Sequence, residues 1–348
     1  MSKAVCYFGS YDPDYARNRI IVKGLKANGV KVYQCQASGL IFSRYLKLLK
    51  YFIKYKDQYH AIIVGFPGHY DVPLAFILGK LFGKKTFYDI FTSTYETYVL
   101  DREVIKKDSF RSRFFYFIDW LGLKLADYVI IDTLAHGRFY DKLYGLNSKK
   151  QILIYVGSDI DYFYPRKLKE ETDVLFYGSY QPLQGADVII KTASLLPNVK
   201  FKMIGKGQTR ANCEALAKKL RLANVEFINW LPLEKLAQEI SKSKVALGIF
   251  GSSIKTSLVI PNKIYDYLAM GKLVITANTQ ASKELLKSGI NAVLIPTGDF
   301  SVLAGEIDEL LRNSALRQKI ADNGYVLLRS ELKPNLVIRD LISKIDER

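Results

Sequence analysis

Short apolar runs alternate with amphipathic stretches along most of the chain. In the first half, runs typical of buried strands fall at residues 3–9, 30–36, 60–66, 84–91, 128–133 and 151–156. In the second half they fall at residues 173–178, 199–205, 225–230, 244–250, 273–277 and 292–295. Helical patterns lie between these runs, and only helical patterns remain after residue 302. This alternation predicts βαβ units and parallel sheets.

A polar, charged stretch at residues 165–172 interrupts the alternation and predicts a domain boundary. The 348 residues are too many for one compact α/β unit and fit two units of ordinary size. We therefore expect an α/β protein with two doubly wound, Rossmann-like domains at residues 1–165 and 166–330, followed by a helical segment at 331–348. The ligand sites of such sheets lie at the carboxyl ends of the strands.

Composition narrows the class of partner. Hydrophobic residues make up 49% of the chain, yet no run is long enough to span a bilayer and no signal peptide is expected. The three cysteines lack disulfide or metal-ligand spacing, which favours a reducing, cytoplasmic location. The net charge of +17 predicts an anionic partner, which could be a nucleic acid, an anionic membrane or a phosphorylated substrate.

Three segments of the second half could hold a phosphate. Glycine loops at residues 178–185 and 205–207 follow strands, and a proline-started helix begins at Asn262. Glycines admit a ligand close to the backbone, and a helix start offers unpaired N–H groups to an anion. Lys263 could donate to a diphosphate, and Asp266, one turn later, could accept from ribose hydroxyls. The alternative is a solvated lysine and an ordinary acid of a first helical turn.

The order of these loops, of Trp230-Leu231-Pro232, and of the segment PNKIYDYLAMGKLVI at residues 261–275 resembles the C-terminal domain of retaining glycosyltransferases of family 4. The resemblance covers about residues 155–315. It implies the GT-B architecture, in which two Rossmann-like domains face a central cleft and the last helix crosses back to the N-terminal domain.

The resemblance also implies which residues bind the donor. Diphosphate contacts are expected from Gly178, Ser179, Gly205, Lys206, Asn262, Lys263 and Ile264. Asp266 would bind the ribose, and Trp230 and Leu231 would meet the nucleobase. No metal or other cofactor is expected, because basic side chains and the helix dipole would stabilise the leaving diphosphate. The chain departs from the family at Leu258, where the first of two glutamates is usual, and at Asp266, which replaces the second.

The first half offers candidates at three strand ends. The loop at Gly9 and Ser10, with Arg17 and Arg19 in the following helix, is expected on the acceptor side. The alternative for the two arginines is a basic helical turn that faces solvent. His69 and Asp89 follow the next strands and are the candidates for polar chemistry, so we expect them to be catalytic; a histidine in such a place can also be purely structural.

A basic amphipathic segment at residues 44–56 contains no acidic residue. Arg44, Lys47, Lys50 and Lys54 recur at helical spacing opposite an apolar stripe. Such a helix can lie on an anionic membrane, and the alternative is a core-packed helix with a basic outer face. We therefore allow for peripheral attachment to the inner face of the plasma membrane.

These observations predict a retaining, metal-independent glycosyltransferase. Its donor would be a nucleotide-sugar, with a UDP-sugar favoured over a GDP-sugar, and its acceptor a lipid-linked or membrane-proximal glycan. Nucleic acid is not expected as a partner, because no small recognition module is present. A nucleotide-sugar 2-epimerase of GT-B fold and a non-catalytic basic protein that binds membranes or nucleic acid remain the alternatives.

Overall fold

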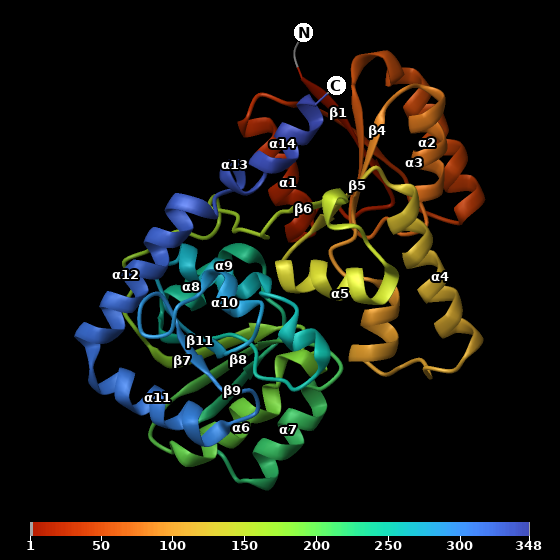
Figure 1. Ribbon diagram of the computed structural model, residues 1–348. Helices are drawn as coiled ribbons and strands as arrows, with labels where there is room; N and C mark the ends of the chain where they lie inside the picture. Colours follow the sequence, from red (N-terminus) through yellow and green to blue (C-terminus); the bar gives the residue numbers. More distant parts are fainter. Residues whose placement is uncertain (1–2, 348) are drawn as a thin grey trace. The chain divides into compact units, whose positions relative to one another are not determined.

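A computed structural model describes residues 3–347, which form two compact units (Figure 1). One unit takes in Met1–Val156 with Lys333–Arg348, and the other takes in Gly157–Leu332. The boundaries therefore lie at 156/157 and 332/333 rather than at the expected 165/166 and 330/331. The first is earlier because the segment after Gly157 bonds to the second unit. Within that unit Ser158 Oγ donates to Asp266 Oδ1 at 2.6 Å.

The first unit is built on a sheet of parallel strands in the order β2-β1-β3-β4-β5-β6. The strands are β1 (Ala4–Gly9), β2 (Lys31–Gln36), β3 (Ala61–Val64), β4 (Lys85–Asp89), β5 (Tyr128–Ile131) and β6 (Gln151–Leu153). The longer helices are α1 (Ala16–Ala27), α2 (Ile41–Tyr55), α3 (Val72–Leu81), α4 (Phe110–Leu125) and α5 (Leu134–Tyr144). β3 is buried at all its positions, which explains its continuous apolar sequence.

The final helical segment of the chain packs on α1. It consists of α13 (Pro334–Val337) and α14 (Arg339–Asp346), both in the first unit. Gly24 of α1 lies so close to Pro334 that a Cβ would overlap its carbonyl oxygen. Asn28 Nδ2 donates to the Asn335 carbonyl oxygen at 2.9 Å. The close approach of α1 and α13 thus depends on a glycine.

The second unit has the strand order β12-β11-β10-β7-β8-β9, again all parallel. The strands are β7 (Thr172–Gly178), β8 (Phe201–Gly205), β9 (Val225–Ile228), β10 (Ser243–Leu247), β11 (Leu273–Ala277) and β12 (Val293–Ile295). The helices are α6 (Ala186–Leu195), α7 (Arg210–Lys219), α8 (Leu233–Ser241), α9 (Asn262–Ala269), α10 (Ser282–Leu285), α11 (Phe300–Arg312) and α12 (Ser314–Glu331). α6 packs against α7 and α11, whereas α12 packs against α9 and β11.

Every apolar run predicted as a strand carries a strand of one of the two sheets. The α/β class with two Rossmann-like units is therefore confirmed. Short helical turns interrupt the loops of both units. They are η1 (Lys56–Gln58), the π-helical turn η2 (Glu96–Asp101), η3 (Ser148–Lys150), η4 (Pro182–Gln184) and η5 (Ile254–Ser257).

Candidate functional site

The glycine loops after β7 and β8 lie side by side. Gly178 ends β7 and pairs in register with Gly205, the last residue of β8. A Cβ on Gly205 would overlap the carbonyl oxygen of Gly178, and one on Gly207 would overlap that of Ser179. Both Gly205 and Gly207 also have positive φ, +125° and +153°, which strains any larger residue. The structure thus brings two of the predicted phosphate loops into backbone contact.

Lys263 lies in the first turn of α9 with its amine beside the first of these loops. A Cβ on Gly178 would lie 2.8 Å from Lys263 Nζ, and Nζ donates to the Gly248 carbonyl oxygen at 3.5 Å. Only 3% of the lysine is exposed. Within residues 3–347, no carboxylate lies at ion-pair distance from Nζ. The amine is therefore buried without a counter-ion.

Physical chemistry disfavours the charged form of Lys263 in this place. The Phe176 ring, centred 3.8 Å from Nζ, favours the cation by about 0.5–2 kcal/mol. Removing an ammonium ion from water costs several kcal/mol, and the positive end of a helix adds to that cost. Burial accordingly lowers the pKa of Lys263 well below its ordinary value. An anion bound next to Nζ would supply the missing counter-charge.

The start of α9 offers backbone donors beside this amine. Pro261 precedes the helix, and no side chain caps it. The first N–H groups of a helix have no intrahelical partner, so those of Asn262 and Lys263 are available to a ligand. The side chain of Ile264 is buried and its N–H donates to the Pro261 carbonyl oxygen at 2.9 Å, so its diphosphate contact stays a prediction.

Both carboxylate oxygens of Asp266 accept hydrogen bonds from side chains. Ser158 Oγ donates to Oδ1 at 2.6 Å, and the Tyr177 hydroxyl donates to Oδ2 at 2.5 Å. The side chain keeps 8% of its surface exposed. Each carboxylate oxygen has a second lone pair, so these bonds leave capacity for a ribose hydroxyl. The ribose contact stays a prediction, and the structure adds two residues that orient the carboxylate.

The other predicted donor residues lie nearer the surface of the second unit. Trp230 is 51% exposed after β9, and Leu231 beside it is half-buried. Lys206 is exposed in the loop after β8, whereas Ser179 is half-buried after β7. An exposed tryptophan can stack on a planar ring. The contacts of all four residues with a donor stay predictions.

Arg210, at the start of α7, is a residue that the sequence reasoning missed. Its guanidinium donates to the Gly205 carbonyl oxygen and, at 2.8 Å, to that of Ile228. It also lies over the rings of Tyr180 and Phe227, at 5.4 and 5.1 Å from their centroids. Arg210 thus ties the ends of β8 and β9 together. The sequence feature that could have identified Arg210 is its position as a basic residue just after the glycine loop at residues 205–207.

In the first unit, an acid that the sequence reasoning passed over anchors the loop at Gly9 and Ser10. The Ser10 amide and hydroxyl both donate to Asp71 Oδ2 at 2.8 Å. Asp71 Oδ1 also pairs with Arg44 Nε at 2.9 Å. Arg19 is half-buried and donates to the Asp14 carbonyl oxygen at 2.6 Å. The acceptor-side role of this loop stays a prediction.

Arg17 and Asp89 bind each other. Arg17 Nε lies 3.0 Å from Asp89 Oδ2, and its NH2 group lies 3.1 Å from Oδ1. The remaining NH1 group donates to the Ile154 carbonyl oxygen at 2.5 Å, and both side chains are fully buried. Arg17 therefore does not face solvent, which excludes the alternative given for it, and its acceptor-side role stays a prediction. The catalytic role of Asp89 stays a prediction that this closed ion pair does not favour.

His69 lies in a buried polar chain. Its Nδ1 is 2.6 Å from the Tyr88 hydroxyl and 3.5 Å from Asp119 Oδ1. Thr94 Oγ1 and the Tyr95 amide also donate to the Asp119 carboxylate, at 3.0 and 2.8 Å. Burial raises the pKa of Asp119 to about 7 despite these donors. With a pKa near 7, the Asp119 carboxyl can bind or release a proton close to neutral pH. The catalytic role of His69 stays a prediction.

A second buried histidine, which the sequence reasoning missed, sits between two acids. His136 Nδ1 lies 2.6 Å from Asp132 Oδ1, and its Nε2 lies 2.8 Å from Glu96 Oε2. Burial opposes the imidazolium, but Glu96 and Asp132 outweigh it and raise the pKa of His136 to about 10. Tyr140 donates to the same Glu96 oxygen at 2.9 Å. This cluster is fully enclosed, so it stabilises the first unit rather than meeting a substrate.

The basic segment forms α2 and its outer surface is partly apolar. Lys47, Lys50 and Lys54 are exposed, but Arg44 is not part of this surface, because it pairs with Asp71. The apolar side chains exposed beside the lysines are Leu40 (84%), Ile41 (51%), Phe42 (76%), Leu46 (54%), Tyr51 (44%) and Ile53 (50%). We call Lys47, Lys50, Lys54 and these apolar residues the α2 surface.

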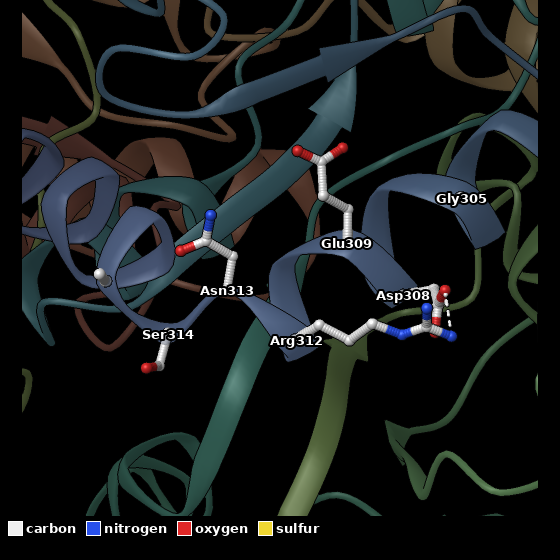
Figure 2. Close-up of a pocket in the computed structure, with 7 residues that line it drawn as sticks. Gly305, Asp308, Glu309, Arg312, Asn313 and Ser314 are labelled. Carbon is white, nitrogen blue, oxygen red and sulfur yellow. Dashed lines mark ion pairs between the residues drawn. The ribbon is translucent and has the colours of Figure 1, made fainter.

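A hollow of about 560 Å3 lies away from the glycine loops, where α11 meets α12 (Figure 2). Its lining residues are Gly305, Asp308, Glu309, Arg312, Asn313, Ser314 and Ala315. Arg312 pairs with Asp308 at 2.9 Å and Glu309 adds a negative charge, so the hollow does not suit a diphosphate.

In the described part of the chain, no helix combines the length and hydropathy needed to cross a membrane.

Comparison with known proteins supports the class that the fold and the loops indicate. Residues 158–326 match the family described as glycosyl transferases group 1. The lipopolysaccharide core biosynthesis glycosyltransferase LpsE of Rhizobium meliloti (strain 1021) is 23% identical over 156 residues, which are 44% of each chain. The phosphatidyl-myo-inositol mannosyltransferase of Mycobacterium leprae (strain TN) is 27% identical over 175 residues, 48% of this chain and 43% of the relative.

Solved structures resemble the whole chain. Anabaena HepE, in complex with UDP and glucose, has a TM-score of 0.73 at 15% identity and covers 100% of both chains. Sucrose-phosphate synthase from Thermosynechococcus elongatus has a TM-score of 0.76 at 16% identity and covers 99% of both chains. At these identities the likeness shows the fold, which is that of GT-B glycosyltransferases.

The predicted resemblance to GT-B, group 1 glycosyltransferases is therefore confirmed, and glycosyltransferase is also the enzyme class of these curated relatives. The matched family region contains the glycine loops, Lys263 and Asp266. The chain spans about half the length of the curated relatives it matches.

Proposed function

We propose that this chain is a glycosyltransferase that uses a nucleotide-sugar, with UDP favoured as the nucleotide. It would transfer the sugar with retention of anomeric configuration and without a metal, to a glycan acceptor that is lipid-linked or close to a membrane. The family match to residues 158–326 and the fold shared with a structure that holds UDP and glucose support the donor class.

The observation that carries the proposal is the buried, unpaired amine of Lys263 beside the Gly178 loop and the start of α9. Burying an amine where no counter-ion stabilises its charged form costs stability, and such an amine is a candidate for contact with an anionic ligand. Backbone N–H groups at a helix start and a lysine together favour a phosphate group. A nucleoside diphosphate supplies two such groups and a ribose.

Each residue of the site would contact a different part of the donor. Lys263 and the N–H groups of Asn262 and Lys263 would hold the diphosphate and stabilise the charge that it gains as the glycosidic bond breaks. Asp266, oriented by Ser158 and Tyr177, would accept from the ribose. Trp230 would cover the nucleobase. This arrangement positions the donor and stabilises its leaving group, which are the two contributions a transferase makes without a protein nucleophile.

The α2 surface supports the proposed acceptor class. Lys47, Lys50 and Lys54 lie among exposed side chains that include Phe42 and Leu46. Exposed apolar groups between lysines suit the boundary of an anionic bilayer, where the lysines meet headgroups. Relatives named for lipopolysaccharide core and for phosphatidyl-myo-inositol agree with such an acceptor.

A thermal-shift titration tests the donor proposal. UDP, GDP and their sugars are added separately to the protein without metal, and we expect UDP and a UDP-sugar to raise the melting temperature. A ligand at a hundred times its dissociation constant stabilises the folded state by about 2.7 kcal/mol. A melting temperature that none of these nucleotides changes would refute the proposal. Sugar transfer to an acceptor, rather than conversion of the nucleotide-sugar alone, separates the transferase from the epimerase.

A further inference from the structure

The surroundings of Lys263 determine whether its amine is charged before and after a ligand binds. The amine has one oxygen partner, the Gly248 carbonyl at 3.5 Å, and otherwise faces the Phe176 ring and the Gly178 backbone. It also sits in the first turn of α9, where the helix dipole repels a cation. The Phe176 ring and the distant Gly248 carbonyl oxygen favour a charge on Nζ, whereas burial, the helix dipole and the lack of a counter-ion oppose it.

A bound diphosphate reverses this balance. Its oxygens carry negative charge and accept hydrogen bonds, so they stabilise an ammonium group at the same place. We propose that Lys263 is uncharged in the empty site and takes up a proton from solvent when a nucleoside diphosphate binds. The inference rests on the proposed function and adds to it that donor binding by this chain is coupled to proton uptake.

The ionisable groups around Lys263 do not offer another explanation. On α9 itself they are Tyr265, Asp266 and Tyr267, and Tyr177 of β7 is joined to α9 by its hydrogen bond to Asp266. Asp266 accepts from Ser158 and Tyr177, and burial raises the pKa of Tyr177 and of Tyr267 above the ordinary value. Burial alone accounts for the lowered pKa of Lys263, with no charged neighbour contributing to it. The added charge must therefore come from the ligand.

The proton balance is simple. A water-derived proton binds the lone pair of Nζ, no covalent bond forms between protein and ligand, and release of the nucleoside diphosphate product returns the proton to solvent. One proton taken up on binding weakens the apparent affinity about tenfold for each unit of rising pH. This applies between the pKa of Lys263 in the empty site and its pKa in the complex.

Isothermal titration calorimetry of the wild-type chain with UDP and with GDP measures this uptake. Titrations in two buffers with different ionisation enthalpies are repeated from about pH 7.5 to about pH 9, where the terminal phosphate, with a pKa near 6, is already ionised. We expect uptake that approaches one proton and a dissociation constant that rises about tenfold per pH unit. Lys263→Arg, whose guanidinium stays charged, should bind with no uptake, as should wild type with uridine.

The outcomes separate the two claims. Tight binding of UDP or GDP with no proton uptake and a constant dissociation constant would overturn the inference and leave the proposed function standing. Uptake that persists in Lys263→Arg would assign the proton to another group and also overturn it. Failure of both nucleotides to bind at any pH would overturn the proposed function and the inference with it.

Discussion

Buried ionisable groups in this protein differ in whether they have a partner of opposite charge. Arg17 and Asp89 neutralise each other in the first unit, and His136 is held between Glu96 and Asp132. Lys263 in the second unit has no such partner. Breaking a buried charge pair destabilises the fold, whereas the buried amine of Lys263 lacks a counter-charge until an anionic ligand binds. We therefore expect substitutions of the paired residues to change mainly stability, and substitution of Lys263 to change mainly ligand binding.

The Arg17–Asp89 pair should be structural. Arg17→Met leaves a buried carboxylate alone and should cost about 3–5 kcal/mol of unfolding free energy, measured by urea denaturation. The double variant Arg17→Met/Asp89→Leu removes both charges and should recover much of that loss. Equal stability of the single and double variants would contradict the pairing. A folded double variant without transfer activity would show instead that the pair also serves the reaction.

His136 should make stability depend on pH. The pKa of His136 is raised to about 10 in the folded state, against an ordinary value of about 6.5 when unfolded. Its stabilising contribution is therefore complete below about pH 6.5 and is lost as the pH rises towards 10. Unfolding free energies measured across this range should fall with pH in wild type. His136→Gln, although less stable at neutral pH, should lack that decline; an unchanged slope would contradict the assignment.

At the scale of elements, local pattern predicted most of the fold. Strands of a parallel sheet are covered on both faces, so they read as apolar runs such as that of β3, and glycines end β7 and β8. What the pattern could not show are contacts between distant elements. Arg17 and Asp89 are 72 positions apart, and Ser158 and Asp266 are 108 apart. The sequence therefore predicted separate roles for Arg17 and Asp89 and could not show that the two residues bind each other.

Two glycine substitutions in helices should have opposite effects. Gly24→Ala places a Cβ against the Pro334 carbonyl oxygen and within 3.0 Å of Ile338, so it should destabilise the α1–α13 packing by about 1–3 kcal/mol. Gly305→Ala in α11 meets nothing within 4 Å and should stabilise by about 0.5–1 kcal/mol through helix propensity. Chemical denaturation of both variants checks this. A tolerated Gly24→Ala would mean that the final segment does not need the close approach.

At the scale of the whole molecule, the net charge of +17 predicts an anionic partner but not which one. The structure helps to choose among these partners, because it shows which basic side chains are paired with acids and which are exposed at the surface. Arg17 and Arg44 are engaged within the first unit, whereas the lysines of the α2 surface are exposed among apolar side chains. That combination suits a bilayer better than a nucleic acid, which needs no apolar contact.

The α2 surface should bind vesicles that contain phosphatidylglycerol. Lys47→Glu/Lys50→Glu should weaken that binding on the order of 30-fold, since each basic residue near an anionic bilayer contributes about 1 kcal/mol, and added salt should weaken it further. Lys218→Glu/Lys219→Glu on α7 makes the same charge change in the second unit and serves as the control. Cosedimentation measures both. Equal loss in the two variants would indicate a general charge effect and contradict a dedicated surface.

The most direct test of the central claim pairs Lys263→Met with the exposed control Lys219→Met in UDP titrations followed by thermal shift. Lys263→Met removes a buried amine without a counter-ion, so the ligand-free variant should melt at the same temperature as wild type or higher, yet UDP should no longer stabilise it. Lys219→Met should respond to UDP like wild type. A Lys263→Met variant that UDP still stabilises as it does wild type would contradict the assignment of the donor site.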